Sequence, residues 1–173
     1  MTTTLPRLIE RFSPNYSSRQ GAAVRLFVWH STISAYRGAV AWLCNPAAQV
    51  SANVVEREDG REATQLVGWN EKAWHVAAYN RVAEGNEMAG PPHTLDQLRA
   101  AARICAYRLR ARRLPPRYAR FGVGVGFTRH RDLGAAGGGH HDPILSPAQW
   151  RLCRSLTKAE YLRGGFRPAW GRG

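Results

Sequence analysis

The chain has 173 residues, a length that fits one domain with or without a tail. A hydrophobic fraction of 44% and six Trp exclude a disordered chain, and a chain of this size buries roughly 70% of its unfolded surface without disulfides. Twenty-five Lys and Arg oppose twelve Asp and Glu, giving a formal net charge of +13 that attracts nucleic acid, anionic lipid or phosphate-bearing wall polymers, among which composition alone does not choose.

Residues 1–22 are expected to form an N-terminal lead-in to the domain. They contain Pro, Ser and Thr but no apolar stretch of a secretory signal, and no segment of the sequence is apolar for long enough to cross a membrane. The cysteines Cys44, Cys105 and Cys153 are widely spaced and form no CxxC pair, so we expect three small buried side chains.

The first half of the chain predicts strands around one short helix. Residues 25–30 are apolar and β-prone, which favours a buried strand, and residues 34–43 have the apolar spacing of a helix that ends at Asn45-Pro46. Strands are expected over 51–58 and 62–67, joined at Asp59-Gly60 by a two-residue hairpin turn.

The second half predicts two long helices separated by a glycine-rich stretch. A short strand over 84–88 precedes a helix that begins at Thr94 with a capping box and stops at Pro115. Residues 122–139 are rich in Gly, and a second capping box at Ser146 starts the last helix.

This order of elements predicts an α/β fold with a central mixed β-sheet flanked by helices. The predicted domain covers residues 23–163, after the lead-in over 1–22. Residues 164–173 form a basic Gly/Arg tail that we expect to be loosely ordered.

Three side chains are candidate metal ligands. His30 ends the first apolar strand, His130 lies in the glycine-rich stretch, and Asp142 follows the His140-His141 pair. Two imidazoles and one carboxylate can hold Zn²⁺ with a fourth position open for water, and the metal would lower the pKa of that water. From the residues alone, His30 is equally well a core histidine and the segment around Asp142 a solvated loop.

Four segments in order resemble the peptidoglycan amidases, the family of phage lysozyme-type amidases and animal peptidoglycan recognition proteins. The second of them also resembles a block of actinobacterial phage endolysins. The matching segments are Val28–Thr32, Trp42–Ser51 with the hairpin 54–60 and 65–67, Ala73–Asn80 with 85–90, and His130–Pro143.

This resemblance implies that His30, His130 and Asp142 are zinc ligands on a mixed sheet flanked by helices. It implies hydrolysis of the amide bond between N-acetylmuramic acid and L-alanine in bacterial peptidoglycan. We expect a monomeric phage or prophage endolysin that is made in the cytoplasm without a signal peptide and acts on the cell wall after release.

The resemblance also implies a basic residue two positions before the third ligand, which here is His140. An imidazolium at this position can stabilise the oxyanion, whereas His141 is expected to point elsewhere. Many relatives carry a Tyr or Glu near the metal where this chain has 51–53, and Asn53 cannot act as a base. The general base is therefore left open among Glu87, a second water and His140.

Four further residues are predicted to bind substrate. Trp74 and His75 lie in the segment that resembles the substrate groove, Asn80 follows it, and Asn53 can hydrogen-bond a peptide group. The alternatives are a core position for Trp74 and an ordinary half-buried histidine at 75.

The arginine-rich segments 110–113 and 163–172 have two interpretations. They are either solvated surface or a docking surface for anionic wall polymers or an outer membrane. Two competing functions remain. A non-catalytic peptidoglycan-binding protein would have lost a ligand, and a basic nucleic-acid-binding protein would leave the His and Asp positions unexplained and has no recognisable binding motif here.

Overall fold

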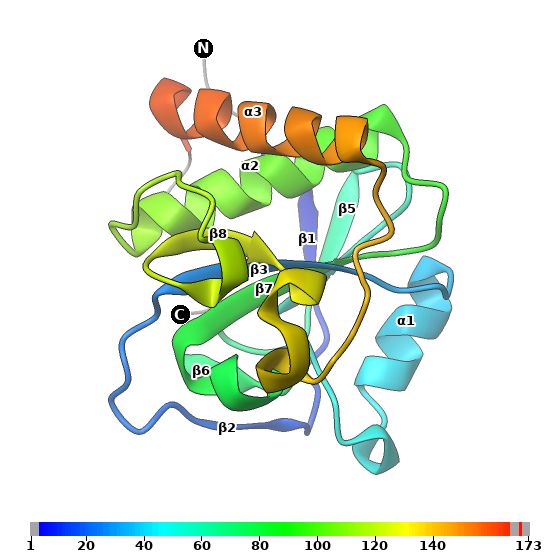
Figure 1. Cartoon of the computed structure of the whole chain (residues 1–173). Helices are drawn as coiled ribbons and strands as arrows, with labels where there is room; N and C mark the ends of the chain where they lie inside the picture. The colour runs from blue at the N-terminus through cyan, green and yellow to red at the C-terminus, as the bar shows by residue number, and fades with distance from the viewer. Residues whose placement is uncertain (1–3, 167–169, 171–173) are drawn as a thin grey trace.

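A computed structural model describes residues 4–166 and residue 170, and it confirms the mixed sheet flanked by helices (Figure 1). Six strands form the central sheet in the order β1-β5-β4-β7-β3-β8, in which only the pair β4 and β5 is antiparallel. These strands are β1 (Arg7–Glu10), β3 (Leu26–Ser31), β4 (Val54–Glu56), β5 (Glu62–Gln65), β7 (Ala83–Met88) and β8 (Gly126–Arg129). A second, antiparallel sheet pairs β2 (Tyr16–Ser18) with β6 (Glu71–Ala73).

The two long helices cover one face of the central sheet and the short helix α1 lies against the other (Figure 1). Both long helices start where the capping boxes predicted, since Thr94 Oγ1 accepts from the Gln97 amide and Ser146 forms both bonds of its box. The helices are α1 (Tyr36–Leu43), α2 (Leu95–Ala111) and α3 (Pro147–Arg163), with the 3₁₀ turns η1 (Pro46–Ala48), η2 (Ala77–Val82), η3 (Arg120–Gly122) and η4 (His130–Gly137).

Strand β3 is buried along its whole length and supplies both faces of the sheet. Phe27 and Trp29 enter the core beneath α2 and α3, whereas Leu26 and Val28 pack on the opposite face. Because side chains alternate along a strand, His30 falls on this second face. The parallel register with β7 sets it opposite Glu87.

Residues 7–10 and 16–18 form β1 and β2, two strands that the sequence did not predict. Both are short and largely exposed, so they have no apolar pattern of their own; β1 exists because it pairs in parallel with β5. Strand β8 was missed for a related reason, since it is four residues long and lies inside the glycine-rich stretch.

The predicted hairpin is present, but its loop is longer than Asp59-Gly60. Strands β4 and β5 are shorter than the ranges 51–58 and 62–67, and the Arg57 amide donates to Glu62 across the loop. Only Gly60 has a positive φ, of 68°, whereas a two-residue turn of this type needs two such residues.

Two of the three cysteines are buried as expected, Cys105 and Cys153, whereas Cys44 is partly exposed, and all three are free thiols. Most of the tail lies outside the described residues, but Trp170 packs beside Trp69 and donates from Nε1 to the Pro6 carbonyl at 2.9 Å. Within residues 4–166 and 170, none of the helices is long and apolar enough to cross a membrane.

Candidate metal centre and active-site pocket

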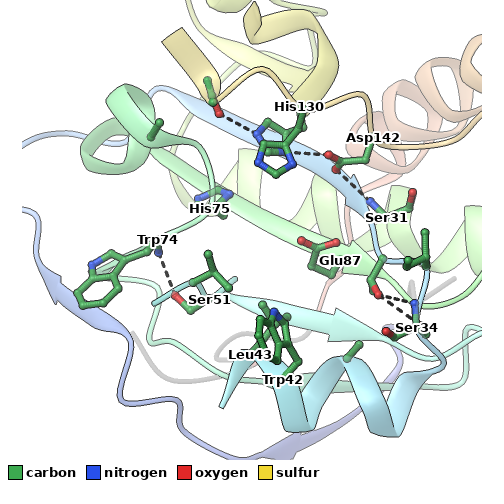
Figure 2. Close-up of a pocket in the computed structure, with 18 of the residues that line it drawn as sticks. Ser31, Ser34, Trp42, Leu43, Ser51, Trp74, His75, Glu87, His130 and Asp142 are labelled. Atoms are coloured by element: carbon green, nitrogen blue, oxygen red, sulfur yellow. Dashed lines mark hydrogen bonds and ion pairs between the residues drawn. The ribbon is translucent and has the colours of Figure 1, made fainter. Parts of the chain in front are cut away.

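A pocket of about 800 Å³ opens on the face of the sheet opposite α2 and α3. His130, Asp142, His75 and Glu87 gather at its inner end, and Figure 2 shows Glu87 between the His/Asp group and the side chain of Trp42. The pocket therefore brings together most of the residues that the sequence singled out, from separate segments between Trp74 and Asp142.

His30, His130 and Asp142 form one cluster, in which one ligand atom of each lies within 4.8 Å of the others. His30 Nδ1 lies 3.0 Å from His130 Nδ1 and 3.2 Å from Asp142 Oδ2, and His130 Nδ1 lies 2.9 Å from Asp142 Oδ1. His30 lies near the end of β3, and His130 directly follows β8. Asp142 comes from the segment before α3. Two imidazole nitrogens and a carboxylate oxygen therefore converge on one point.

The hydrogen bonds around the cluster select ligand forms of both rings. His130 Nε2 lies 2.8 Å from the Gly137 carbonyl oxygen, to which it donates, so its Nδ1 presents a lone pair to the cluster. His30 Nε2 lies 2.8 Å from His75 Nδ1, and donation along this contact leaves a lone pair on His30 Nδ1 as well. Two facing lone pairs beside a carboxylate need a cation between them, so these residues fit a zinc ion.

The electrostatics of the cluster agree with this assignment. Burial lowers the pKa of His30 to about 4, which keeps the imidazole neutral. Burial raises the pKa of Asp142, but its interactions with His130 and His30 outweigh burial and hold that pKa well below the usual range. A neutral imidazole and an ionised carboxylate are the forms that bind metals.

His75 is held in place beside the cluster by its own neighbours. Asn80 Oδ1 accepts from the backbone amides of His75 and Val76, at 2.9 and 2.7 Å. Gly85 lies under the ring, where a Cβ atom would come within 2.8 Å of His75 Cε1. Burial of the ring lowers the pKa of His75 well below its ordinary value. His75 and Asn80 therefore set the orientation of His30.

Glu87 and His140 are the polar groups that face the cluster from the pocket. Glu87 Oε1 lies 3.8 Å from His30 Nδ1, and burial, with the charge of Asp142, raises the pKa of Glu87 well above its ordinary value. The His140 ring stacks on that of His130 with centroids 4.5 Å apart. His141 also lines the pocket and is exposed. A carboxyl and an imidazole thus stand on two sides of the candidate metal position.

The sequence profile of the N-acetylmuramoyl-L-alanine amidase family matches residues 20–144, well over half of the chain. The chain belongs to this family. The match includes all three candidate ligands and both polar groups that face them. It ends before α3, so the last helix lies outside the matched region.

One curated protein is similar to this chain in sequence, and several solved structures are similar to it in fold. N-acetylmuramoyl-L-alanine amidase A of Achromobacter lyticus is 38% identical over 80 residues, which cover 45% of this chain and 44% of that protein. The Staphylococcus aureus hydrolase AmiA, solved with its ligand, superposes with a TM-score of 0.77 at 19% identity, over 96% of this chain and 90% of that one. A mutant endolysin from Bacillus subtilis gives 0.67 at 16% identity, over 88% and 99%. The matched part spans under half the length of the curated relative.

Asn53 and Trp74 differ in how they relate to the amidase pocket. Asn53 is fully buried, its Oδ1 accepts from the Gly85 amide, and its Nδ2 donates to the Val67 and Gly68 carbonyls. The structure therefore gives Asn53 no exposed surface for the predicted substrate contact, because its amide is bonded to the backbone of β7 and of the segment after β5. Trp74 is partly exposed and lines the pocket, with its Nε1 donating to Ser17 Oγ at 3.0 Å, so it is no core residue.

The sequence did not predict an apolar rim around the pocket of this amidase-family chain. The rim consists of four exposed large side chains from α1 and the neighbouring loops: Ile33, Trp42, Val50 and Ile144. Trp42 is 57% exposed although it lies on a helix with a buried stripe. The sequence did contain a signal for this rim, since Trp42 is large and apolar but lies off the buried stripe of its helix. Exposed apolar groups of this kind gather at binding sites.

Proposed function

We propose that this chain hydrolyses the amide bond between N-acetylmuramic acid and L-alanine in peptidoglycan, with Zn²⁺ held by His30, His130 and Asp142. The proposal rests chiefly on the 4.8 Å cluster of the three ligand atoms at the inner end of a large open pocket. Family membership supplies the reaction type, since the matched profile is that of the N-acetylmuramoyl-L-alanine amidases.

In this proposal the chain's own residues manage charge and protons. Zinc, when bound, polarises the scissile carbonyl and lowers the pKa of water. His140 donates a hydrogen bond to the oxyanion that forms as water adds to the carbonyl carbon. Glu87 accepts the proton from that water and delivers it to the amine nitrogen as the C–N bond breaks. The products are a free carboxyl on the sugar lactyl group and a free amine on alanine.

The apolar rim and Trp74 orient the substrate around this centre. Trp42 and Trp74 offer aromatic surface to the sugar or the peptide methyl groups, and Ile33 and Ile144 border the same opening. His75 and Asn80 act through His30, which they position, so we assign them positioning roles rather than direct substrate contacts.

We further propose an endolysin-like role, in which the enzyme reaches the wall after release from the cell that makes it. The net charge of +13 favours contact with anionic wall polymers or an outer-membrane surface. Of the arginines at 110–113, Arg112 is engaged with Glu84 and Arg110 donates to the Tyr161 carbonyl, whereas Arg113 is exposed and available for such contact. The predicted contacts at 167–169 and 171–173 lie outside the described residues.

The test is release of free amine from purified peptidoglycan, measured with and without a chelator and after zinc is restored. We expect activity that the chelator abolishes and zinc restores. Asp142→Asn and His130→Ala are expected to lose both bound zinc and activity. His140→Ala should keep zinc but lower kcat by about 10²–10³-fold, the effect of removing one oxyanion donor.

His141→Ala is the matched control for His140→Ala, because both side chains line the pocket and only His140 stacks on His130. It should stay within about threefold of the parent, as expected for a side chain outside the reaction. Zinc-loaded protein that binds peptidoglycan without releasing amine would instead establish a non-catalytic binding protein.

A further inference from the structure

A second, smaller pocket of about 230 Å³ is lined by the connection from β2 to β3 and by Arg112, the residue that follows α2. It shares no lining residue with the pocket that contains the metal centre. Its walls are residues 18–24, Asn70 and Arg112. Nothing in the proposed amidase reaction makes use of this pocket.

Arg19 lines this pocket and is only 5% exposed. Its Nη1 donates to the carbonyl oxygens of Asn80 and Arg81, each at 3.1 Å. Its Nε and Nη2 are buried and have no hydrogen-bond partner among residues 4–166 and 170. A buried charged donor without a partner is unfavourable, so the Nε/Nη2 edge calls for an acceptor from outside the chain.

The charge around Arg19 is not balanced by the carboxylate nearest to it. Both oxygens of Glu84 accept from other arginines: Arg108 Nε and Nη2 donate at 2.9 and 3.0 Å, and Arg112 Nε donates at 2.7 Å. One carboxylate therefore interacts with three guanidinium groups, with two of them by hydrogen bonds and with Arg19 through its charge. Burial lowers the pKa of Arg19 to about 10; Glu84 opposes this shift, and Arg112 and Arg108 add to it. An added anion would relieve this repulsion.

We propose that this pocket is a binding site for an oxyanion of the phosphate class, held side-on by Nε and Nη2 of Arg19. This edge of a guanidinium presents two parallel N–H groups, which match two oxygens of a phosphate. Arg112, whose side chain is 25% exposed, adds a second positive charge at the pocket wall. The ligand is either free phosphate or a phosphate ester such as those of anionic wall polymers.

The test is a calorimetric titration of the full chain with inorganic phosphate at constant ionic strength. We expect saturable binding with one phosphate per chain. Ala23 is exposed and lines the pocket, so Ala23→Glu places a competing carboxylate there without removing a buried group. This variant is expected to weaken phosphate binding at least about tenfold, as is Arg19→Gln if it folds, because charge-assisted bonds are lost.

Two controls separate this site from general attraction to a basic protein. Ala23→Gln has nearly the size of the glutamate variant without its charge, and Arg113→Gln removes an exposed arginine outside the pocket. Both should stay within about twofold of the parent, as surface changes do. Equal weakening in Arg113→Gln, unchanged binding in Ala23→Glu, or no saturable binding would each overturn the proposal.

Two further ligands identify the chemical source. If glycerol phosphate competes with inorganic phosphate for the site, the ligand is a phosphate ester. If glycerol phosphate does not compete, the ligand is the free phosphate ion. Acetate that binds as tightly as phosphate would overturn the assignment to the phosphate class. Amidase activity enters none of these measurements, so this proposal and the proposed function can fail separately.

Discussion

Buried polar side chains have different partners on the two faces of the central sheet, and β7 has side chains on both faces. Glu84 and Asn86 point toward α2, where they meet Arg108 and Glu56. Gly85 and Glu87 face the pocket, where they meet the histidine cluster. On the helix face the carboxylate of Glu84 is bonded to arginines, whereas on the pocket face the described residues bring two imidazoles and a carboxylate together.

This difference follows from the alternation of a strand, which assigns neighbouring residues to opposite faces. On the helix face burial makes an unpaired charge unfavourable, so a carboxylate is either held by arginines, as Glu84 is, or has a pKa that burial raises, as Glu56 has. On the pocket face the proposed zinc ion would relieve the same cost. In β7 the even-numbered residues Glu84 and Asn86 therefore contribute to stability, whereas the odd-numbered Gly85 and Glu87 face the pocket.

The largest expected effect is a loss of stability caused by a substitution on the helix face. Arg108→Met leaves Glu84 without its most buried partner, since the side chains of the pair are only 7% and 1% exposed. We expect the free energy of unfolding to fall by about 3–5 kcal/mol, as when one member of a buried pair is removed. Urea unfolding followed by Trp fluorescence measures this change.

Arg99→Gln is the control for Arg108→Met, since it breaks an exposed pair with Asp96 on the same helix. Its effect should stay below about 1 kcal/mol. Activity per folded molecule should be unchanged in both variants. A large loss of activity in folded Arg108→Met would contradict the division of labour between the two faces.

The next largest effect is on the pocket face. In Gly85→Ala the new methyl group would lie 2.8 Å from His75 Cε1 and 2.9 Å from the Val28 carbonyl, so His75 must move away from His30. We expect zinc affinity and activity to fall by about 10–100-fold, the usual cost of disturbing a residue that orients a ligand. Gly38→Ala is the matched control, because its methyl group would meet only Ser34 Cβ at 3.6 Å. A Gly85→Ala protein with the zinc affinity of Gly38→Ala would exclude a positioning role for His75.

A third effect depends on pH and belongs to the helix face. Burial raises the pKa of Glu56 well above 4.5, so the folded protein retains a proton that an unfolded chain releases. Stability is therefore greatest below the unfolded pKa and declines by about 1.4 kcal/mol per pH unit as pH rises toward the folded pKa. Glu56→Gln removes this decline, so its advantage over the parent in urea unfolding should grow as pH rises above the ordinary carboxyl pKa.

Asp59→Asn provides a contrast of opposite sign to Glu56→Gln. Its hydrogen bond with Arg57 lowers the pKa of Asp59, so its contribution to stability is present above the ordinary carboxyl pKa and lost as pH falls. The variant should match the parent in acid and be slightly less stable at neutral pH. Parallel pH profiles for Glu56→Gln and the parent would show that Glu56 is ionised in the folded protein.

The smallest effect concerns the cap of the helix that covers the first face. Ser146→Ala removes the side-chain acceptor for the Gln149 amide at the start of α3. We expect a loss of about 1 kcal/mol, with no change in zinc binding. Ser155→Ala, at an exposed position within the same helix, should leave the melting temperature nearly unchanged. Equal losses in the two variants would mean that the cap does not stabilise α3.

Local sequence patterns determined the features that depend on a few neighbouring residues. The capping boxes at Thr94 and Ser146 predicted where the long helices begin, because a cap involves only the first turn. The buried strand ending at His30 was predicted from its own apolar residues. His130 and Asp142 were chosen by residue type and by resemblance to the amidases, and the structure brings them together with His30.

Only the tertiary structure decided what depends on partners distant in the chain. Strand β1 acquires its conformation from β5, and Asn53 is withdrawn from the pocket because Gly85 and Val67 lie beside it. The free edge of Arg19 is likewise a property of the surroundings, since Glu84 is already occupied by other arginines. Pairing and desolvation act between segments that no local pattern relates, and for that reason the fold had to be known before these roles could be assigned.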